Sequence, residues 1–330
     1  MVDYQNHFKN KIFKNDLFSN HKITYKKIYN HEVVKIFKKI TSLNHENINI
    51  FISKNDTATN SVNFIIDKVN RFYALSKLRI NNHLILPIKK YNNFLQTNDS
   101  IWSIYKYFDG ELFSGKKNQI KIVAKFISKI SILIKKLYVD EKSFTYFTSE
   151  ENKLVNKYLK NSNLRKKIFT GANEKIFFNF FFNELKRLQK KKKEFNNLKK
   201  TFCHFDMHPH NIMIKDHKIK IIDLASIKFM PLEIALAFSG LKLCRQTIYK
   251  NKNKNYTEVG LKFVKSLNSS LTKKLNKSLN ISDLASIEIM RRICIIFTFN
   301  YLGDKSLNFI LPTLMSNLIE AKLIFNEISF

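Results

Sequence analysis

The stretch HFDMHPHN at residues 204–211, followed by IID at residues 221–223, decides how this sequence is interpreted. It supplies a carboxylate at Asp206, an amide at Asn211 and a second carboxylate at Asp223. A carboxylate can orient a hydroxyl group and accept its proton, and Mg²⁺ prefers carboxylate and amide oxygens as ligands. Phosphoryl transfer from ATP requires these groups, because that reaction depends on positioning and on charge stabilisation by the metal.

The residues around this stretch predict how the three groups come together. A loop dense in polar residues runs from Phe202 to Asn211. After it, Ile212–Lys215 and Ile219–Leu224 alternate around Asp216-His217, which predicts a short β-hairpin. The loop would hold the first carboxylate and the amide on one surface, and the hairpin would return the second carboxylate to them.

The first third of the chain is rich in alternating β-branched and aromatic residues, which predicts strands. One region, residues 62–79, changes to helical spacing of its apolar residues. The predicted strands are Ile23–Ile28, Val33–Ile40, Asn47–Lys54, His83–Lys89 and Ile101–Phe108.

The rest of the chain is mostly helical in pattern, after a turn or linker at Asp109-Gly110-Glu111. Together the two patterns predict an α+β protein with a β-rich N-terminal lobe (residues 1–108) and a larger helical C-terminal lobe (residues 109–330). The predicted helices are Ile120–Leu137, Glu174–Lys193, one from Pro231 to about Thr247, and several within residues 257–328.

The motif HxDxxxxN followed by a hydrophobic strand ending in Asp resembles the signature of the aminoglycoside phosphotransferase, choline kinase and homoserine kinase superfamily. The resemblance implies a protein-kinase-like bilobal fold, with ATP bound between the lobes and its γ-phosphate moved to a hydroxyl of a small molecule. By the same resemblance Asp206 matches the catalytic base, and Asn211 and Asp223 match the ligands of Mg²⁺. His204 matches a histidine that supports the loop. Phe205 departs from the pattern, because it stands where the family usually has a small residue beside the catalytic Asp.

The segment from Trp102 to Gly110 resembles the family's hinge strand, which lies against the adenine ring. The resemblance implies that Tyr105, Tyr107 and Phe108 contact the nucleotide. The residue pattern of this segment resembles the branch that contains sugar kinases and type II homoserine kinases. The acceptor therefore stays open among sugars, amino-sugars or aminoglycosides, choline-like alcohols and homoserine.

The family also has a strand lysine that contacts the ATP phosphates and pairs with an acid on the following helix. Lys54 is the candidate here, with Asp67 as its partner, and Lys77 is the rival lysine. The family's glycine-containing turn between the first two strands is replaced by Asn30-His31-Glu32. This difference bears on nucleotide affinity and supports an alternative, a degenerate member of the fold that binds a ligand without catalysis.

Two other interpretations of the motif remain. Asp206 and Asn211 could merely cap turns, and three histidines, His204, His208 and His210, could hold zinc.

The net charge of +32 has two explanations. It could attract a polyanion such as nucleic acid. It could also reflect coding bias, which we favour because Phe, at 30 residues, is abundant alongside Lys and has no electrostatic reason to be. No nucleic-acid motif is present.

Three cysteines, an odd number, argue against a disulfide framework and favour a reducing cytoplasm. The sequence shows neither a signal-peptide core nor an apolar stretch long enough to span a membrane.

Overall fold

The computed structural model describes part of the chain in two compact units. The units comprise residues 1–110 and residues 111–330, and each is described by itself. The described residues are 22–27, 34–40, 48–56, 95–96, 100–106, 108, 110–134, 172–222, 227–269, 279–301, 308–326 and 328–329. The assignment of nucleotide binding to the N-terminal unit stays a prediction.

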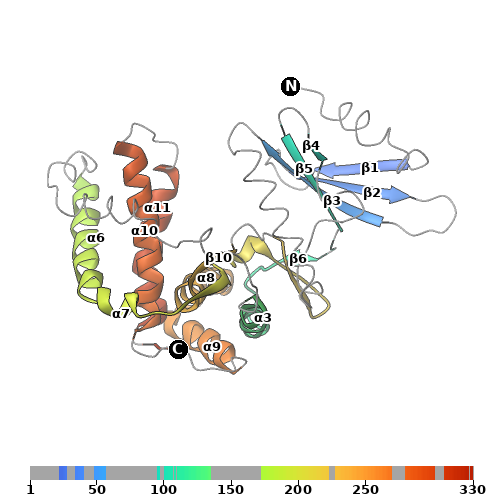
Figure 1. Ribbon diagram of the computed structural model, residues 1–330. Helices are drawn as coiled ribbons and strands as arrows, with labels where there is room; N and C mark the ends of the chain where they lie inside the picture. The colour runs from blue at the N-terminus through green and yellow to red at the C-terminus, as the bar shows by residue number, and fades with distance from the viewer. Residues whose placement is uncertain are drawn as a thin grey trace. The chain divides into compact units, whose positions relative to one another are not determined.

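The N-terminal unit contains a five-stranded antiparallel sheet with the strand order β1-β2-β3-β5-β4 (Figure 1). Four of the predicted strands are confirmed to within two residues at each end, and β4 was not predicted. The predicted helix over residues 62–79 and the strand over residues 83–89 lie outside the described residues. The strands are β1 (Lys22–Lys27), β2 (Val34–Ile40), β3 (Ile48–Asp56), β4 (Leu95–Gln96) and β5 (Ser100–Lys106).

The C-terminal unit contains every helix that the structure describes. The predicted helices are confirmed, except that the one predicted over residues 174–193 is interrupted at Lys191. The main helices are α3 (Gln119–Ile134), α6 (Ala172–Lys190), α7 (Lys192–Asn196), α8 (Leu232–Asn251), α9 (Tyr256–Asn268), α10 (Ile281–Tyr301) and α11 (Leu311–Phe325). Two 3₁₀ turns accompany them, η3 (Pro209–Asn211) and η4 (Asn308–Ile310).

The described residues of this unit also form two small antiparallel sheets. The first joins β6 (Glu111–Leu112), β8 (Ile212–Lys215) and β9 (Lys218–Ile221), so the predicted hairpin is confirmed. The second pairs β7 (Lys200–His204) with β10 (Ile227–Pro231). The prediction of a loop from Phe202 onward was wrong for the residues of β7, because they are buried and find a partner strand that follows the hairpin.

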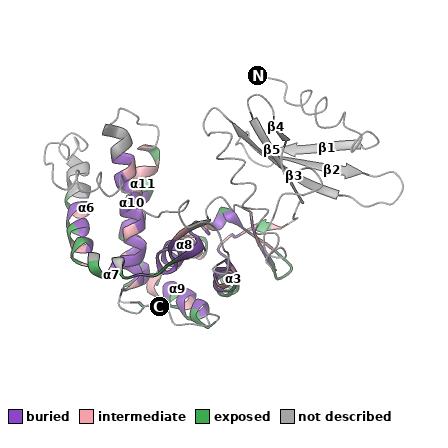
Figure 2. Cartoon of the chain, in the orientation of Figure 1, coloured by how far each residue is buried: buried purple, intermediate pink, exposed green. Residues whose placement is uncertain are grey.

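The core of the C-terminal unit lies where α8 and α10 pack against each other and against α11. Figure 2 shows α8 and α10 as almost continuously buried helices. Helices that neighbours cover on every face are mostly apolar, and the buried charges of α10, such as Asp283 and Glu288, form ion pairs. The largest fully buried side chains are aromatic, and each contributes roughly 1.5–3 kcal/mol of hydrophobic stabilisation. They are Phe181, Phe238, Phe263 and Phe325.

Glycines mark two places where backbones approach closely. Gly115 has φ of +80°, and a Cβ there would lie 2.5 Å from the carbonyl oxygen of Gln246 in α8. Asn251 at the end of α8 fixes this approach by donating to the Gly115 carbonyl at 2.7 Å. A Cβ on Gly260 would likewise collide with the backbone of Ile324, so α9 and α11 need a glycine at that crossing.

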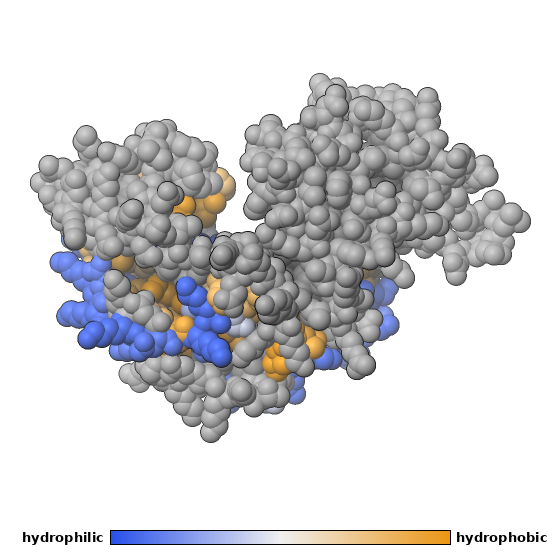
Figure 3. Space-filling model, viewed as in Figure 1, coloured by the Kyte–Doolittle hydropathy of each residue, from blue (hydrophilic) through white to orange (hydrophobic). Residues whose placement is uncertain are grey.

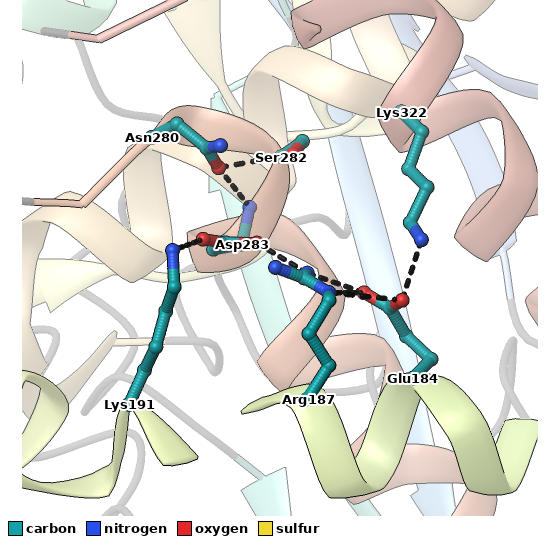
Figure 4. A network of polar contacts seen from close by, with 7 residues as sticks. All are labelled: Glu184, Arg187, Lys191, Asn280, Ser282, Asp283 and Lys322. Carbon is teal, nitrogen blue, oxygen red and sulfur yellow. Dashed lines mark hydrogen bonds and ion pairs between the residues drawn. The ribbon is translucent and has the colours of Figure 1, made fainter. Parts of the chain in front are cut away.

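A network of ion pairs ties α6 to α10 and α11 (Figure 4). Buried Asp283 of α10 accepts hydrogen bonds from Arg187 and from Lys191, the latter at 2.6 Å. Glu184 pairs with Arg187 and with Lys322 of α11, each at 2.5 Å. Burial alone would raise the pKa of Glu184, but these two cations outweigh burial and lower it. Glu184 therefore stays ionised, and the network holds three helices together.

The surface over α6 and α7 is strongly cationic, and Figure 3 shows hydrophilic side chains gathered there. Its exposed lysines are Lys186, Lys190, Lys193, Lys199 and Lys200. Within the described part of the chain, none of the helices is long and apolar enough to cross a bilayer.

Candidate active site

The backbone of the loop after β7 is held around the carbonyl group of Asp206. That carbonyl accepts hydrogen bonds from the backbone N–H of His208 at 2.9 Å and from the side-chain amide of Asn211 at 3.0 Å. Fully buried His204 accepts from the backbone N–H of Asp206 through Nδ1, at 3.3 Å. The five-residue spacing between Asp206 and Asn211 therefore brings both groups to one place.

The short 3₁₀ turn η3 sets the far end of this loop. His208 precedes the turn and accepts from the backbone N–H of His210 through Nδ1 at 3.2 Å, and Pro209 occupies its first position. The Nδ1 atoms of His204 and His208 both accept backbone hydrogen bonds, so these hydrogen bonds fix both imidazole rings against the loop. Within the described ranges no three His, Cys, Asp or Glu side chains are grouped to hold a metal ion, so the zinc interpretation was wrong.

The hairpin returns the chain to Asn211. Its turn residues Asp216 and His217 have φ of 45° and 65°, the left-handed values that a two-residue type I′ turn needs. Ile212 pairs with Ile221, and the backbone N–H of Ile222 donates to the carbonyl of Asn211 at 3.1 Å. Asp223 is the next residue in the chain and lies outside the described residues.

The carboxylate of Asp206 forms an ion pair with Lys242 of α8, with Oδ1 and Nζ 2.6 Å apart. Burial alone would raise the pKa of the Asp206 carboxyl, but the charges of Lys242 and Arg292 outweigh it and lower the pKa. The pKa of Lys242 is also lowered, because burial disfavours its charge more than Asp206 supports it. Asp206 is therefore ionised at neutral pH and is 19 % exposed, so its side chain does more than cap a turn.

A second cation, Arg292 of α10, lies close to this pair. Its guanidinium carbon is 5.2 Å from the ring centroid of Phe205 and 4.3 Å from that of Phe238. Its Nε donates to Glu288 at 2.7 Å. Phe205, the residue that departs from the usual motif, thus provides one of two aromatic rings that hold this guanidinium.

The side chain of Asn211 fits a magnesium ligand. The side chain is buried, with 7 % of its surface exposed, and its amide nitrogen donates a hydrogen bond to the Asp206 carbonyl. This bond orients the amide and leaves Oδ1 with no hydrogen-bond donor among the described residues. An oriented amide oxygen is a donor of the kind that Mg²⁺ prefers.

The chain was compared with known proteins by sequence and by structure, and only the structural comparison finds matches. No family model matches the sequence, and no curated protein is detectably similar to it. Solved structures do match: amicoumacin kinase in complex with AMP-PNP and Ca²⁺ has a TM-score of 0.61 at 9 % identity, with 99 % of this chain and 98 % of that chain covered. Spectinomycin phosphotransferase in complex with ADP has a TM-score of 0.57 at 14 % identity, over 94 % and 93 % of the two chains. Choline kinase from Streptococcus pneumoniae has a TM-score of 0.56 at 13 % identity, over 96 % and 98 %.

This chain has the protein-kinase-like fold of the small-molecule kinases. The predicted α+β fold is confirmed, and the resemblance read from the motif is confirmed at the level of the fold. At these identities the similarity concerns the fold, and the roles of individual residues stay predictions.

The residues predicted to contact the nucleotide lie in the N-terminal unit of this kinase fold. Lys54 is in β3 and pairs with Trp102 of β5, and Tyr105 of β5 pairs with Phe51. The two strands that carry Lys54 and Tyr105 are therefore neighbours in one sheet. Phe108 follows β5, is half-buried, and its carbonyl accepts from Gly110 N–H at 2.9 Å.

Three other residues named from the sequence lie outside the described residues. They are Asp67, Tyr107 and the rival lysine Lys77. The nucleotide contacts of this kinase fold therefore stay predictions.

Sequence reasoning missed two residues of this site, Lys242 and Arg292. Each had a signal: Lys242 is the one charge in the apolar run IALAFSGLKLC, and Arg292 interrupts IEIMRRICIIF. A charge within an otherwise buried helix needs a specific partner. Here the partners are Asp206 and Glu288.

Proposed function

We propose that the chain is an ATP-dependent phosphotransferase that moves the γ-phosphate of ATP to a hydroxyl group of a small molecule. The observation that carries the proposal is the ionised, partly exposed carboxylate of Asp206, whose backbone is bonded to the oriented amide of Asn211. The complexes of similar proteins with AMP-PNP and ADP support the choice of nucleotide.

In this proposal Asp206 orients the acceptor hydroxyl and takes its proton. The acceptor oxygen forms a bond to the γ-phosphorus, the bond from that phosphorus to the bridging oxygen breaks, and ADP leaves with the electron pair. The proton ends on the Asp206 carboxylate and then passes to solvent. Because the transition state is loose, most of the proton transfer is late, and a base of lowered pKa acts mainly by positioning.

Asn211 and Asp223 are the proposed ligands of Mg²⁺. The bound ion would neutralise charge on the ATP phosphates. Asn211 contributes its Oδ1, which the bond to the Asp206 carbonyl holds in one orientation. Ca²⁺ in the amicoumacin kinase complex supports a divalent cation in proteins of this fold.

The N-terminal unit is the proposed nucleotide-binding lobe. Lys54, paired with Asp67, would contact the phosphates, and Tyr105, Tyr107 and Phe108 would lie along the adenine. The position of Lys54 and Tyr105 on adjacent strands supports placing both at one nucleotide. We also propose a cytoplasmic location, which the three buried cysteines, none of them in a disulfide, support.

The test replaces the carboxylate alone. We expect Asp206→Asn to lower kcat by about 10²- to 10⁴-fold, the usual contribution of a general base, while the thermal shift produced by MgATP is kept. Turnover is measured as ADP release with a panel of sugars, amino-sugars, choline and homoserine. Asp216→Asn is the matched control, because this exposed turn residue adopts a left-handed conformation that Asn tolerates.

Undiminished turnover in Asp206→Asn would refute the assignment of the base. The alternative function, a ligand-binding protein of this fold without catalysis, is favoured by the glycine-free turn at residues 30–32. It predicts that the wild-type chain releases no ADP with any acceptor and shows no thermal shift with MgATP.

A further inference from the structure

Two cations flank the proposed catalytic carboxylate and share one aromatic support. Lys242 comes from α8 and Arg292 from α10, and both lie over the fully buried ring of Phe238. The ring centroid is 4.5 Å from Nζ of Lys242 and 4.3 Å from the guanidinium carbon of Arg292. The two side chains are 20 % and 24 % exposed. They are therefore fixed by packing and still accessible to a ligand.

The other charges around this pair offset it only in part. The loop, α8 and α10 together contribute Asp206, His208, Lys242, Glu288, Arg291 and Arg292. Glu288 is fully buried, and its oxygens accept from Arg291 at 2.9 and 3.1 Å and from Arg292 at 2.7 Å. Its charge is thus taken up by the two guanidiniums. Within this described group Asp206 is the only partly exposed carboxylate, and it is already paired with Lys242.

Both cations keep hydrogen-bonding capacity. The ammonium of Lys242 has three donors, and Asp206 accepts one of them. Arg292 uses Nε for Glu288, and none of the described residues accepts from its two terminal nitrogens. A guanidinium presents these donors in a planar fork that matches a carboxylate or a phosphate.

We propose that the acceptor is an anion, a hydroxyl compound whose carboxylate or phosphate group is bound by Lys242 and Arg292. This inference rests on the proposed phosphotransferase function and narrows its substrate class. A choline-like alcohol or an aminoglycoside would bring a positive charge beside two partly buried cations, and like charges in such a place reject a ligand. An acceptor anion would instead replace part of the water around both groups.

The same cations could serve the transferred phosphate instead of the acceptor. The two roles differ in what a substitution changes. If Arg292 binds the acceptor anion, its loss lowers turnover of anionic acceptors and spares neutral ones. If it faces the transferred phosphate, its loss lowers turnover of all acceptors by the same factor.

The experiment uses the full chain and acceptors matched in shape but not in charge. Glucuronate is anionic, glucose is neutral and glucosamine is cationic, and the three share one ring. Glycerate and glycerol form a second set with an anionic and a neutral member. Glucose 6-phosphate separates a phosphate from a carboxylate. Binding is measured by saturation-transfer NMR with MgAMP-PNP present, and turnover by ADP release with MgATP. We expect the anionic member of a set to exceed its neutral partner by about 10- to 100-fold in affinity or kcat/KM, as for a charged hydrogen bond.

Variants separate this site from the general positive charge of the chain. Arg292→Gln should reduce the preference for the anionic acceptor by about 10-fold, because Gln cannot replace the charged planar fork of donors. Lys265→Met removes the same charge from an exposed position on α9 and should leave the preference unchanged.

Three results would overturn the inference. They are equal or stronger binding of the neutral or cationic member, no binding of any anionic member, and an unchanged preference in Arg292→Gln. A preference for a cationic acceptor would still leave the phosphotransferase function standing. Absence of both ADP release and a MgATP thermal shift would instead remove the proposed function, and this inference with it.

Discussion

Glu288→Gln keeps the shape of a side chain in α10 and removes its charge. The native carboxylate is fully buried and lies between two guanidiniums, those of Arg291 and Arg292. Burial alone would raise its pKa, but the two positive charges and their hydrogen bonds outweigh burial and lower the pKa from 4.5 to about 2. The folded state therefore holds the proton less tightly than the unfolded state does.

That difference sets the size and the sign of the effect. A carboxyl whose pKa is lowered from 4.5 to about 2 stabilises the folded state by about 3 kcal/mol where it is ionised in both states. The stabilisation is complete above pH 4.5 and is lost as the pH falls through that value toward 2. About 1 kcal/mol is lost by pH 4 and about 2 kcal/mol by pH 3.

The assay is urea unfolding followed by far-UV circular dichroism, because the described helices all belong to the C-terminal unit that carries Glu288. At pH 6.5 we expect Glu288→Gln to be less stable than wild type by about 3 kcal/mol, since the buried guanidinium of Arg291 and the partly buried one of Arg292 lose their counter-charge. The gap should narrow by about 2 kcal/mol between pH 6.5 and pH 3. Glu258→Gln, at an exposed position on α9, should show no such narrowing. A gap that stays constant over this range would refute the reasoning.

Two further predictions concern the packing of the C-terminal unit. Asp283→Asn removes the buried charge that two basic side chains share, and we expect a loss of about 2–3 kcal/mol, seen as a lower Tm. Glu111→Gln, which breaks an exposed ion pair, should change Tm little, and equal effects of the two substitutions would contradict the argument. Gly260→Ala places a Cβ against the backbone of α11 and should cost about 1–3 kcal/mol, measured by the same melting curve. An unchanged Tm would show that α9 and α11 can separate without cost.

The sequence predicted those parts of the fold whose signal is local. The strands of the N-terminal sheet alternate, and the hairpin carries its turn at Asp216-His217, so both were found. The strand β7 was missed because its pairing partner, β10, lies beyond the intervening hairpin. No local periodicity reports such a partner, and the polar residues that follow β7 made the whole segment look like a loop.

The same distinction holds within the site. Asp206 and Asn211 are five residues apart, so one loop can bring them together and the motif contains the information. Lys242 is 36 residues from Asp206 and reaches it only because α8 packs beneath the loop. Arg292 depends on the packing of α8 against α10. Their positions follow from the tertiary fold, which the motif does not encode.

Phe205 belongs to the local sequence motif and also to the tertiary packing around Arg292. In the sequence it is only a departure from the motif of the family that the chain resembles. In the structure its ring lies 5.2 Å from the guanidinium of Arg292, so the departure and the cation form one arrangement. A small side chain at this position would remove this aromatic contact and leave the ring of Phe238 and the carboxylate of Glu288 to hold Arg292. The loop therefore supplies the groups proposed for phosphoryl transfer, and α8 and α10, through Lys242 and Arg292, supply the charge proposed to select the acceptor.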